Sequence, residues 1–319
     1  MAALEDQAFA SPHFTLHRLA DGVYHAIARE GGAAMSNAGI VDLGDHTLVF
    51  DTFLTPQAAR DLRAAAERLT VHPVTTVINS HWHNDHVCGN QVFEDVAIIG
   101  AKRTSELVET NVAASVAEIW QEGPEYLASL ERQLAEATTP EQRATLEREL
   151  TDARVMVAGM EGLRVTPPNQ TFADQQTFSG GGRSVQLMTY GGGHTESDAF
   201  LYLPAERILF AGDLVVIENH PWMGHGNPDA WDRILDRLAA LDIATIAPGH
   251  GPVGTPDAFG AMRRYLVDIQ QIARAGVAAG QSADELAVTP IPPQYADYAE
   301  PGVWGNDLRF LHGKLTEQK

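Results

Sequence analysis

Apolar and polar residues alternate in four short runs near the start of the chain. The runs are residues 14–19 and 23–28, joined by an Asp-Gly step, and residues 36–43 and 46–51, joined by a Gly-Asp step. A period of two places apolar side chains on one face of a strand, and these dipeptides are typical of tight turns. The pattern predicts an antiparallel meander at the beginning of a β-sheet.

The period then changes from two to that of a helix. After Thr55, a proline occupies the first helical position, and apolar residues recur at helical spacing as far as Leu69. Residues 74–79 follow as an apolar run that is typical of a buried strand. Strand, helix and strand in this order predict an α/β fold.

Residues 103–159 differ in character from the rest of the chain. They are rich in Ala, Glu, Leu and Gln, with few breakers besides Gly123-Pro124 and the step at Pro140. Thr139 and Gln142 flank that proline as a capping box, which predicts a helical hairpin. Packing between the two arms is the simpler role of their leucines, and a lid or a dimer contact is the alternative.

Strand signals return in the second half of the chain at residues 183–190, 199–203, 207–210 and 244–247. Helices are expected from Asn227-Pro228 to Leu241 and from Thr255-Pro256 to about Ala279, and residues 282–285 form a second capping box. Neither a short repeat nor a linker interrupts this order. We therefore expect one domain over residues 1–319, with a helical insertion at about 103–159.

The sequence His81-Trp82-His83-Asn84-Asp85-His86, which we call the histidine loop, directly follows the apolar run at 74–79. Imidazole nitrogen and carboxylate oxygen are ligands that Zn²⁺ prefers. Residues two apart share a side of an extended chain, so His81 and His83 can reach one ion. Asp85 and His86 follow too closely to complete that site, which predicts a second ion beside the first.

Three further candidate ligands follow predicted strands. His194 comes after Gly191-Gly192-Gly193, whose glycines allow a tight turn and close approach of the backbone. Asp213 and His250 end the sequences Ala-Gly-Asp and Pro-Gly-His. The simpler interpretation of His194 is a solvated side chain in a glycine turn.

Composition limits the partners and the cellular location. The net charge of −20 disfavours binding to nucleic acid phosphates and to anionic membranes. Cys88 is the single cysteine, which excludes an intramolecular disulfide and suits a reducing compartment. The first residues lack the apolar stretch of a signal peptide, and no run reaches membrane-spanning length. We expect a cytoplasmic protein, unless a leader has been removed.

Taken together, these motifs resemble the metallo-β-lactamase superfamily of hydrolases over about residues 14–275, leaving out the insertion. The resemblance implies a four-layer αββα sandwich with the site at one edge, between two sheets. It also implies that His81, His83 and His194 bind one metal, that Asp85, His86 and His250 bind a second, and that Asp213 bridges them. Asp51 matches the first acidic motif of the family and is expected to support the histidine loop from behind.

Two departures from true β-lactamases concern the substrate. Many of those enzymes carry a metal-binding cysteine where this chain has Asp213, and often a lysine for the antibiotic carboxylate where this chain has Val216. A bridging carboxylate resembles instead the glyoxalase II, lactonase and general hydrolase branches. We therefore expect a binuclear-zinc hydrolase, with iron or manganese as the alternative metals. A metal-bridging hydroxide would attack the carbonyl of a small ester, lactone, thioester or amide, with Asp85 handling the proton, and β-lactamase action would be a side activity.

Substrate contacts are expected from the segment 218–225, with His220, Trp222, Met223 and His225 as the candidates. The alternative is a loop in which Trp222 packs on the core and the histidines are solvated. Among other functions, an iron-dependent oxidoreductase that resembles persulfide dioxygenases ranks second. A nucleic-acid-processing enzyme and a catalytically silent binding protein rank lower. The expected partners are a small-molecule substrate and a second copy of the chain, bound through the insertion.

Overall fold

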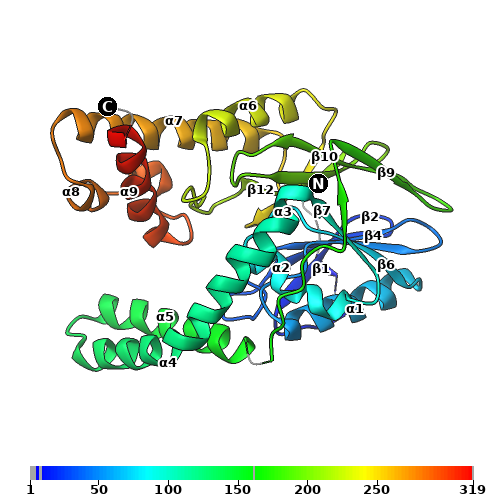
Figure 1. Cartoon of the computed structure of the whole chain (residues 1–319), viewed down its shortest axis with the longest axis horizontal. Helices are drawn as coiled ribbons and strands as arrows, with labels where there is room; N and C mark the ends of the chain where they lie inside the picture. The colour runs from blue at the N-terminus through cyan, green and yellow to red at the C-terminus, as the bar shows by residue number, and fades with distance from the viewer. Residues whose placement is uncertain (1–4, 7–8, 161, 318–319) are drawn as a thin grey trace. The chain divides into compact units, whose positions relative to one another are not determined.

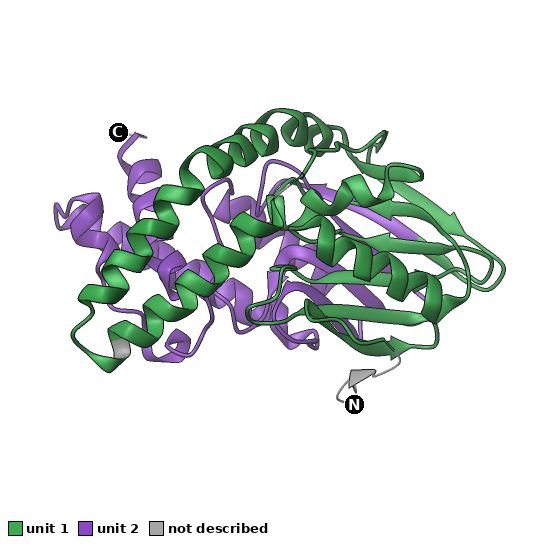
Figure 2. Cartoon of the chain, turned by 90° about the horizontal axis from the view of Figure 1, so that it is seen from below, with its two compact units in different colours: residues 1–185 green, residues 186–319 purple. Residues whose placement is uncertain are grey.

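The computed structural model describes residues 5–6, 9–160 and 162–317 and divides the chain into two compact units, residues 1–185 and 186–319 (Figure 2). Each unit combines a β-sheet with packed helices, so the predicted α/β class is confirmed. The single domain stays a prediction.

Unit 1 contains an eight-stranded sheet in which the strands lie in chain order. Strands β1 to β5 are antiparallel to their neighbours, as the predicted meander requires, and β5 to β8 are parallel. Strand β8 was not predicted, because it has only three residues and two of them are exposed. The strands are β1 (Glu5–Asp6), β2 (Phe14–Ala20), β3 (Val23–Ala28), β4 (Ala38–Asp42), β5 (Thr47–Phe50), β6 (Val74–Ile78), β7 (Ala97–Ala101) and β8 (Gln170–Phe172).

Helix α1 (Pro56–Thr70) links β5 to β6, the connection that a parallel pair of strands needs. Thr55 caps it by accepting a hydrogen bond from the Ala58 N–H, and the proline at its start has no N–H to leave unsatisfied. Its buried face, which includes Ala59 and Leu62, packs in one core with residues of the sheet. The short elements α2 (Asn84–Val87), η1 (Cys88–Phe93) and β9 (Gln175–Ser179) complete this unit outside the insertion.

The predicted helical insertion is present in unit 1. It consists of α3 (Lys102–Leu107), the π-helical turn η2 (Val108–Val112), α4 (Ala113–Glu136) and α5 (Pro140–Gly159). Helices α4 and α5 lie side by side as a hairpin (Figures 1 and 2), and the predicted capping box at Thr139 is present. The leucines of the two arms pack together around Leu130 and Leu150. Helix α4 continues through Pro124, where the sequence indicated a break.

Unit 2 contains the sheet order β13-β12-β11-β10, with β12 antiparallel to β11 and parallel to β13. The strands are β10 (Ser184–Gly191), β11 (Asp198–Leu203), β12 (Ile208–Val216) and β13 (Thr245–His250), and the helical elements are α6 (Pro228–Ala239), α7 (Asp257–Ala278), α8 (Ala283–Ala287), η3 (Pro293–Tyr295) and α9 (Pro301–Glu317). Helices α6, α7 and α9 share one core with this sheet.

Two elements of unit 2 differ from the sequence prediction. Strand β12 continues to Val216, so Asp213 lies inside the strand rather than at its end. Helix α9 was not predicted, because its three glycines weaken the helical signal. It forms because Trp304, Leu308 and Leu311 are buried in the core of the unit. Among the described helices, none is both long and apolar enough to cross a bilayer.

Candidate metal centre

The histidine loop gathers four potential ligands at the carboxyl end of β6. The ring centroid of His81 lies 4.7 Å from that of His83 and 4.3 Å from that of His86. Asp85 Oδ2 lies 3.4 Å from His86 Nε2. Helix α2 starts at Asn84 and turns the backbone back here, so residues adjacent in sequence bring their side chains to one place.

Ser80 and Asp51 hold the two buried rings of this loop from behind. The Ser80 hydroxyl donates to Asp51 Oδ2 at 2.7 Å, so the His81 Nδ1–H can donate to the Ser80 oxygen at 2.9 Å. The His86 Nδ1–H donates to Asp51 Oδ2 at 2.9 Å. Both hydrogen bonds use Nδ1, which leaves Nε2 of each ring as the candidate ligand atom.

Asp51 is hydrogen-bonded to Ser80 and His86 of this region, and its expected support of a metal site stays a prediction. Its backbone has a φ of 61°, a left-handed conformation that aspartate tolerates better than most residues. It also accepts a hydrogen bond from the Ser80 N–H at 2.7 Å. Burial raises the pKa of the Asp51 carboxyl, and the nearby His86 ring opposes that shift.

The three candidate ligands of unit 2 also lie together. Asp213 Oδ2 is 3.3 Å from His194 Nε2 and 3.4 Å from His250 Nε2. One carboxylate oxygen is therefore close to both imidazoles, an arrangement suited to a ligand shared by two ions. His194 and Asp213 are buried, so the solvated histidine in a glycine turn is excluded for His194.

Two glycines make this approach possible. A Cβ at Gly249 would lie 1.9 Å from Asp213 Oδ1, so only glycine fits beside that carboxylate. A Cβ at Gly193 would lie 2.9 Å from the Trp231 backbone, where α6 packs under the His194 turn. The ring of Trp231 meets His194 edge-on, with 5.2 Å between centroids.

Asp198 is a residue of this cluster that the sequence analysis missed. Its buried carboxylate accepts hydrogen bonds from the backbone N–H groups of Gly193 (2.7 Å), His194 (2.9 Å) and Thr195 (3.1 Å) and from the Thr195 hydroxyl (2.7 Å). Burial raises its pKa to about 7, although these donors act in the opposite direction. The signal in the sequence was Thr195 followed three residues later by an acid, a spacing that permits a closed turn.

The four substrate-contact candidates separate by burial. The side chains of His220 and Met223 are buried, and their contact with a substrate stays a prediction. His220 is not solvated, because its ring lies edge-on to Tyr265, Tyr298 and Trp304. Trp222 and His225 are exposed and remain candidates.

The types of donor atom in both units suit a metal ion such as zinc. The ligand atoms of His81 and His83, of Asp85 and His86, and of His194 and Asp213 lie within 4.8 Å of one another in each pair. All are imidazole nitrogens or carboxylate oxygens, the ligands of borderline and hard ions. Cys88 is buried in an apolar cluster with Trp82 and Val87, and burial raises the pKa of its thiol, which disfavours a thiolate ligand.

The chain thus has an α/β fold with imidazole and carboxylate groups of the kind that hold metal ions fixed beside its strands. The family model described as the metallo-beta-lactamase superfamily matches residues 31–250, which is more than half of the chain. The chain therefore belongs to the metallo-beta-lactamase superfamily. The matched segment contains all seven candidate ligands and Asp51.

Two characterised relatives differ in how much of the chain they match. The metallo-beta-lactamase type 2 of Bacteroides fragilis is 30% identical over 118 residues, 35% of this chain and 47% of that protein. The linear primary-alkylsulfatase of Pseudomonas sp. (strain ATCC 19151) is 24% identical over 292 residues, 81% of this chain and 51% of that protein. The chain thus spans about half the length of these relatives.

Solved structures show the same fold at low sequence identity. The DIM-1 metallo-beta-lactamase exposed to ceftazidime has a TM-score of 0.58 at 15% identity, covering 81% of this chain and 99% of that one. A metallo-beta-lactamase from Pontibacter korlensis has a TM-score of 0.55 at 19% identity, covering 83% and 99%. These similarities confirm the fold implied by the sequence motifs.

Proposed function

We propose that the chain is a binuclear-zinc hydrolase of a small ester, lactone, thioester or amide. The observation that carries the proposal is the shared carboxylate oxygen of Asp213, which lies within 3.4 Å of Nε2 of both His194 and His250. Such an oxygen suits a bridge between two ions, and the histidine loop supplies four more donors. His81, His83 and His194 would hold one ion, and Asp85, His86 and His250 the other.

Zinc bound by these residues would polarise a carbonyl and lower the pKa of a water molecule to about 7. The residues of the chain contribute orientation and proton handling. Ser80 and Asp51 fix the rings of His81 and His86, so no reorganisation of these ligands accompanies the reaction. The Asp85 side chain is 22% exposed, unlike the buried His86, and this exposure lets one of its oxygens accept and pass on a proton.

The substrate class follows from the groups near Asp213. Val216 lies three residues after it and is buried, so this position offers no cation to a substrate carboxylate. The net charge of −20 gives anionic substrates no long-range attraction. We therefore expect neutral lactones, esters and thioesters to have a higher kcat/KM than penicillins or carbapenems.

The test combines metal analysis with a substrate panel. Protein purified without chelator should contain close to two metal ions per chain, mostly zinc. Asp85→Asn should abolish hydrolysis of a lactone and a thioester at retained metal content, whereas Asp174→Asn, an exposed acid elsewhere in unit 1, should leave it unchanged. One iron and no second ion would instead favour the persulfide-dioxygenase-like oxidoreductase. Efficient carbapenem hydrolysis with inert lactones would contradict the substrate preference.

A sulfate ester is a second candidate substrate. The observation in its favour is that the alkylsulfatase relative matches 81% of the chain, whereas the β-lactamase relative matches 35%. Adding a linear alkyl sulfate to the panel separates the two classes, since release of sulfate and release of a carboxylic acid are measured independently. Sulfate release that exceeds lactone hydrolysis would favour this candidate.

A further inference from the structure

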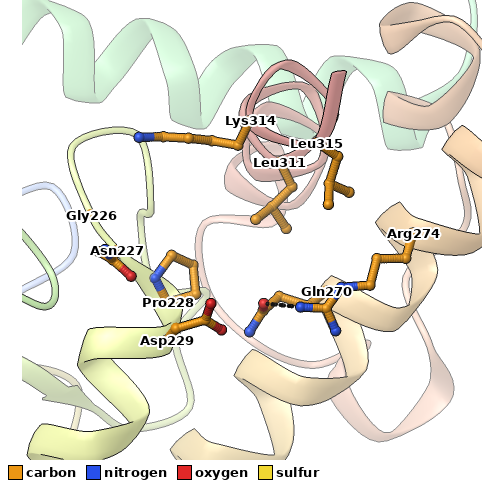
Figure 3. Close-up of a pocket in the computed structure, with 9 residues that line it drawn as sticks. All are labelled: Gly226, Asn227, Pro228, Asp229, Gln270, Arg274, Leu311, Lys314 and Leu315. Carbon is orange, nitrogen blue, oxygen red and sulfur yellow. Dashed lines mark hydrogen bonds between the residues drawn. The ribbon is translucent and has the colours of Figure 1, made fainter. Parts of the chain in front are cut away.

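A cavity of about 190 Å³ in unit 2 lies among α6, α7 and α9 (Figure 3). None of its lining residues is a candidate metal ligand. The start of α6 contributes Asn227 and Asp229, α7 contributes Gln270 and Arg274, and α9 contributes Lys314 with two leucines. Its volume is below the roughly 300–1,000 Å³ of pockets for drug-sized ligands, so it suits a compact molecule.

Among the described residues, some basic side chains of unit 2 form ion pairs with carboxylates, but the two cations of this cavity do not. Arg207 and Arg263 lie 2.6 Å from Asp242 and 2.7 Å from Asp232, respectively. Arg274, in contrast, donates to the neutral Gln270 side chain at 2.9 Å, and Lys314 lies 5.2 Å from the centre of the Phe310 ring. Within the part of the chain that the structure describes, neither has a carboxylate partner.

The charge of the lining selects the charge of the ligand. Arg274 and Lys314 provide two positive charges and Asp229 one negative charge, which leaves a net charge of +1. The carboxylate of Asp229 lies in the first turn of α6, where the helix dipole already stabilises it. A monoanion therefore neutralises the cavity, whereas a neutral ligand or a cation does not.

The apolar part of the lining selects the rest of the ligand. Leu311 and Leu315 lie between Lys314 and Arg274 in the view of Figure 3, on the wall formed by α9. A ligand whose charged group meets one of these cations can therefore lay its apolar atoms against the leucines. We propose that this cavity is a binding site for a small amphipathic monoanion, a carboxylate or sulfate head group on a short alkyl chain.

Ligand-observed NMR titration of the full-length, metal-loaded protein tests this site, with pentanoate, pentyl sulfate and pentanol as probes. Arg274→Gln and Lys314→Gln should each weaken binding of an anionic probe up to about fivefold, and the double variant by about tenfold or more, because each removes one exposed charge interaction. Arg264→Gln is the control, since Arg264 is an exposed cation on the same helix that does not line the cavity. Pentanol should bind more weakly than either anion.

The outcomes separate this site from the metal centre. Loss of affinity in the double variant with unchanged zinc content supports the cavity, whichever anion binds more tightly. Anion binding that is equal in the wild type and the double variant would overturn the proposal, because the anion would then be held elsewhere, such as at the metal ions. Undetectable binding of both anions, or equal binding of pentanol, would also overturn it.

Discussion

Single buried carboxylates hold the backbone that presents the candidate ligands. Asp51 binds Ser80 and His86 in unit 1, and Asp198 binds the turn that carries His194 in unit 2. Each accepts several hydrogen bonds and is itself buried. Burial of a carboxylate without hydrogen-bond donors would cost free energy, so the carboxylate and the turn that donates to it stabilise each other.

At this scale, Asp198 can be tested directly. Asp198→Ala leaves three buried N–H groups without their acceptor, which should lower the free energy of unfolding by about 3 kcal/mol. It should also weaken zinc binding by about 10- to 100-fold, because the His194 turn loses its orientation. Asp198→Asn keeps one carbonyl oxygen and should restore part of both losses. Urea denaturation and competition with a zinc chelator measure the two effects.

The control for this residue is Asp297→Ala, which removes an exposed acid of the same unit and should change neither quantity. An Asp198→Ala protein with the zinc affinity of the wild type would show that the turn keeps its shape without the carboxylate.

At the scale of elements, the root of the helical insertion contacts the histidine loop. Val112, the last residue of η2, and Val116, in the first turn of α4, pack in one cluster with Trp82. The Asn84 side chain donates to Ser115 Oγ at 2.8 Å. The distal arms have a separate cluster around Leu130 and Leu150. The insertion therefore combines a root that supports the candidate site with arms that pack on each other.

This division predicts different effects of two cavity-forming substitutions. Val112→Ala should cost about 2 kcal/mol of stability and also weaken zinc binding, since its cluster includes Trp82 between two candidate ligands. Leu130→Ala should cost about 3 kcal/mol in the arms and leave zinc binding unchanged. Hydrogen exchange of α4 and α5 together with zinc titration distinguishes them. Equal loss of zinc affinity in both variants would mean that the arms and the root act as one.

Two aromatic residues on α4 are exposed, as a homodimer formed through the insertion would require. Trp120 is 51% exposed and Tyr126 is 48% exposed. The dimer through residues 103–159 stays a prediction, as do the lid and the cytoplasmic location.

At the scale of the whole molecule, buried titratable groups couple stability to pH. His220 is enclosed by aromatic rings, with Nδ1 2.6 Å from the Tyr265 hydroxyl, and burial lowers its pKa to about 4. Asp307 is buried on α9, accepts a hydrogen bond from the Met223 N–H, and has a pKa that burial raises well above its ordinary value. As the pH falls, His220 therefore lowers the free energy of unfolding, whereas Asp307 raises it.

In the unfolded chain His220 has a pKa near 6.5, whereas in the folded protein its pKa is about 4. Between these two pH values the unfolded chain binds a proton at His220 and the folded protein does not. Its stabilising contribution is therefore complete above pH 6.5 and is lost as the pH falls toward 4. Between pH 7 and pH 5 the loss is about 2 kcal/mol, at about 1.4 kcal/mol per pKa unit. His220→Phe should lose less stability than the wild type over this interval in urea denaturation, because phenylalanine binds no proton. Asp307 contributes equally to the variant and to the wild type. Equal losses would show that His220 is protonated in the folded protein.

The sequence by itself determined the α/β class, the meander, the helical hairpin with its capping box, and the set of candidate ligands. These features depend on local periodicity, turn residues and ligand chemistry, all of which can be recognised from residues close together in the sequence. His81, His83, Asp85 and His86 are adjacent along the chain, so their proximity required no tertiary information. Membership of the superfamily agrees with the motifs for the same reason.

Only the tertiary structure decided which side chains are buried and which distant residues meet. In the folded chain His220 and Met223 are buried, and β12 extends beyond Asp213. The glycine-containing segment of α9 is helical, because packing against a core outweighs local propensity. It also revealed Asp198 as the acceptor for the His194 turn. The cavity of Arg274 and Lys314 is the clearest case, since α6, α7 and α9 bring together residues about 40 to 90 positions apart, which no local pattern can predict.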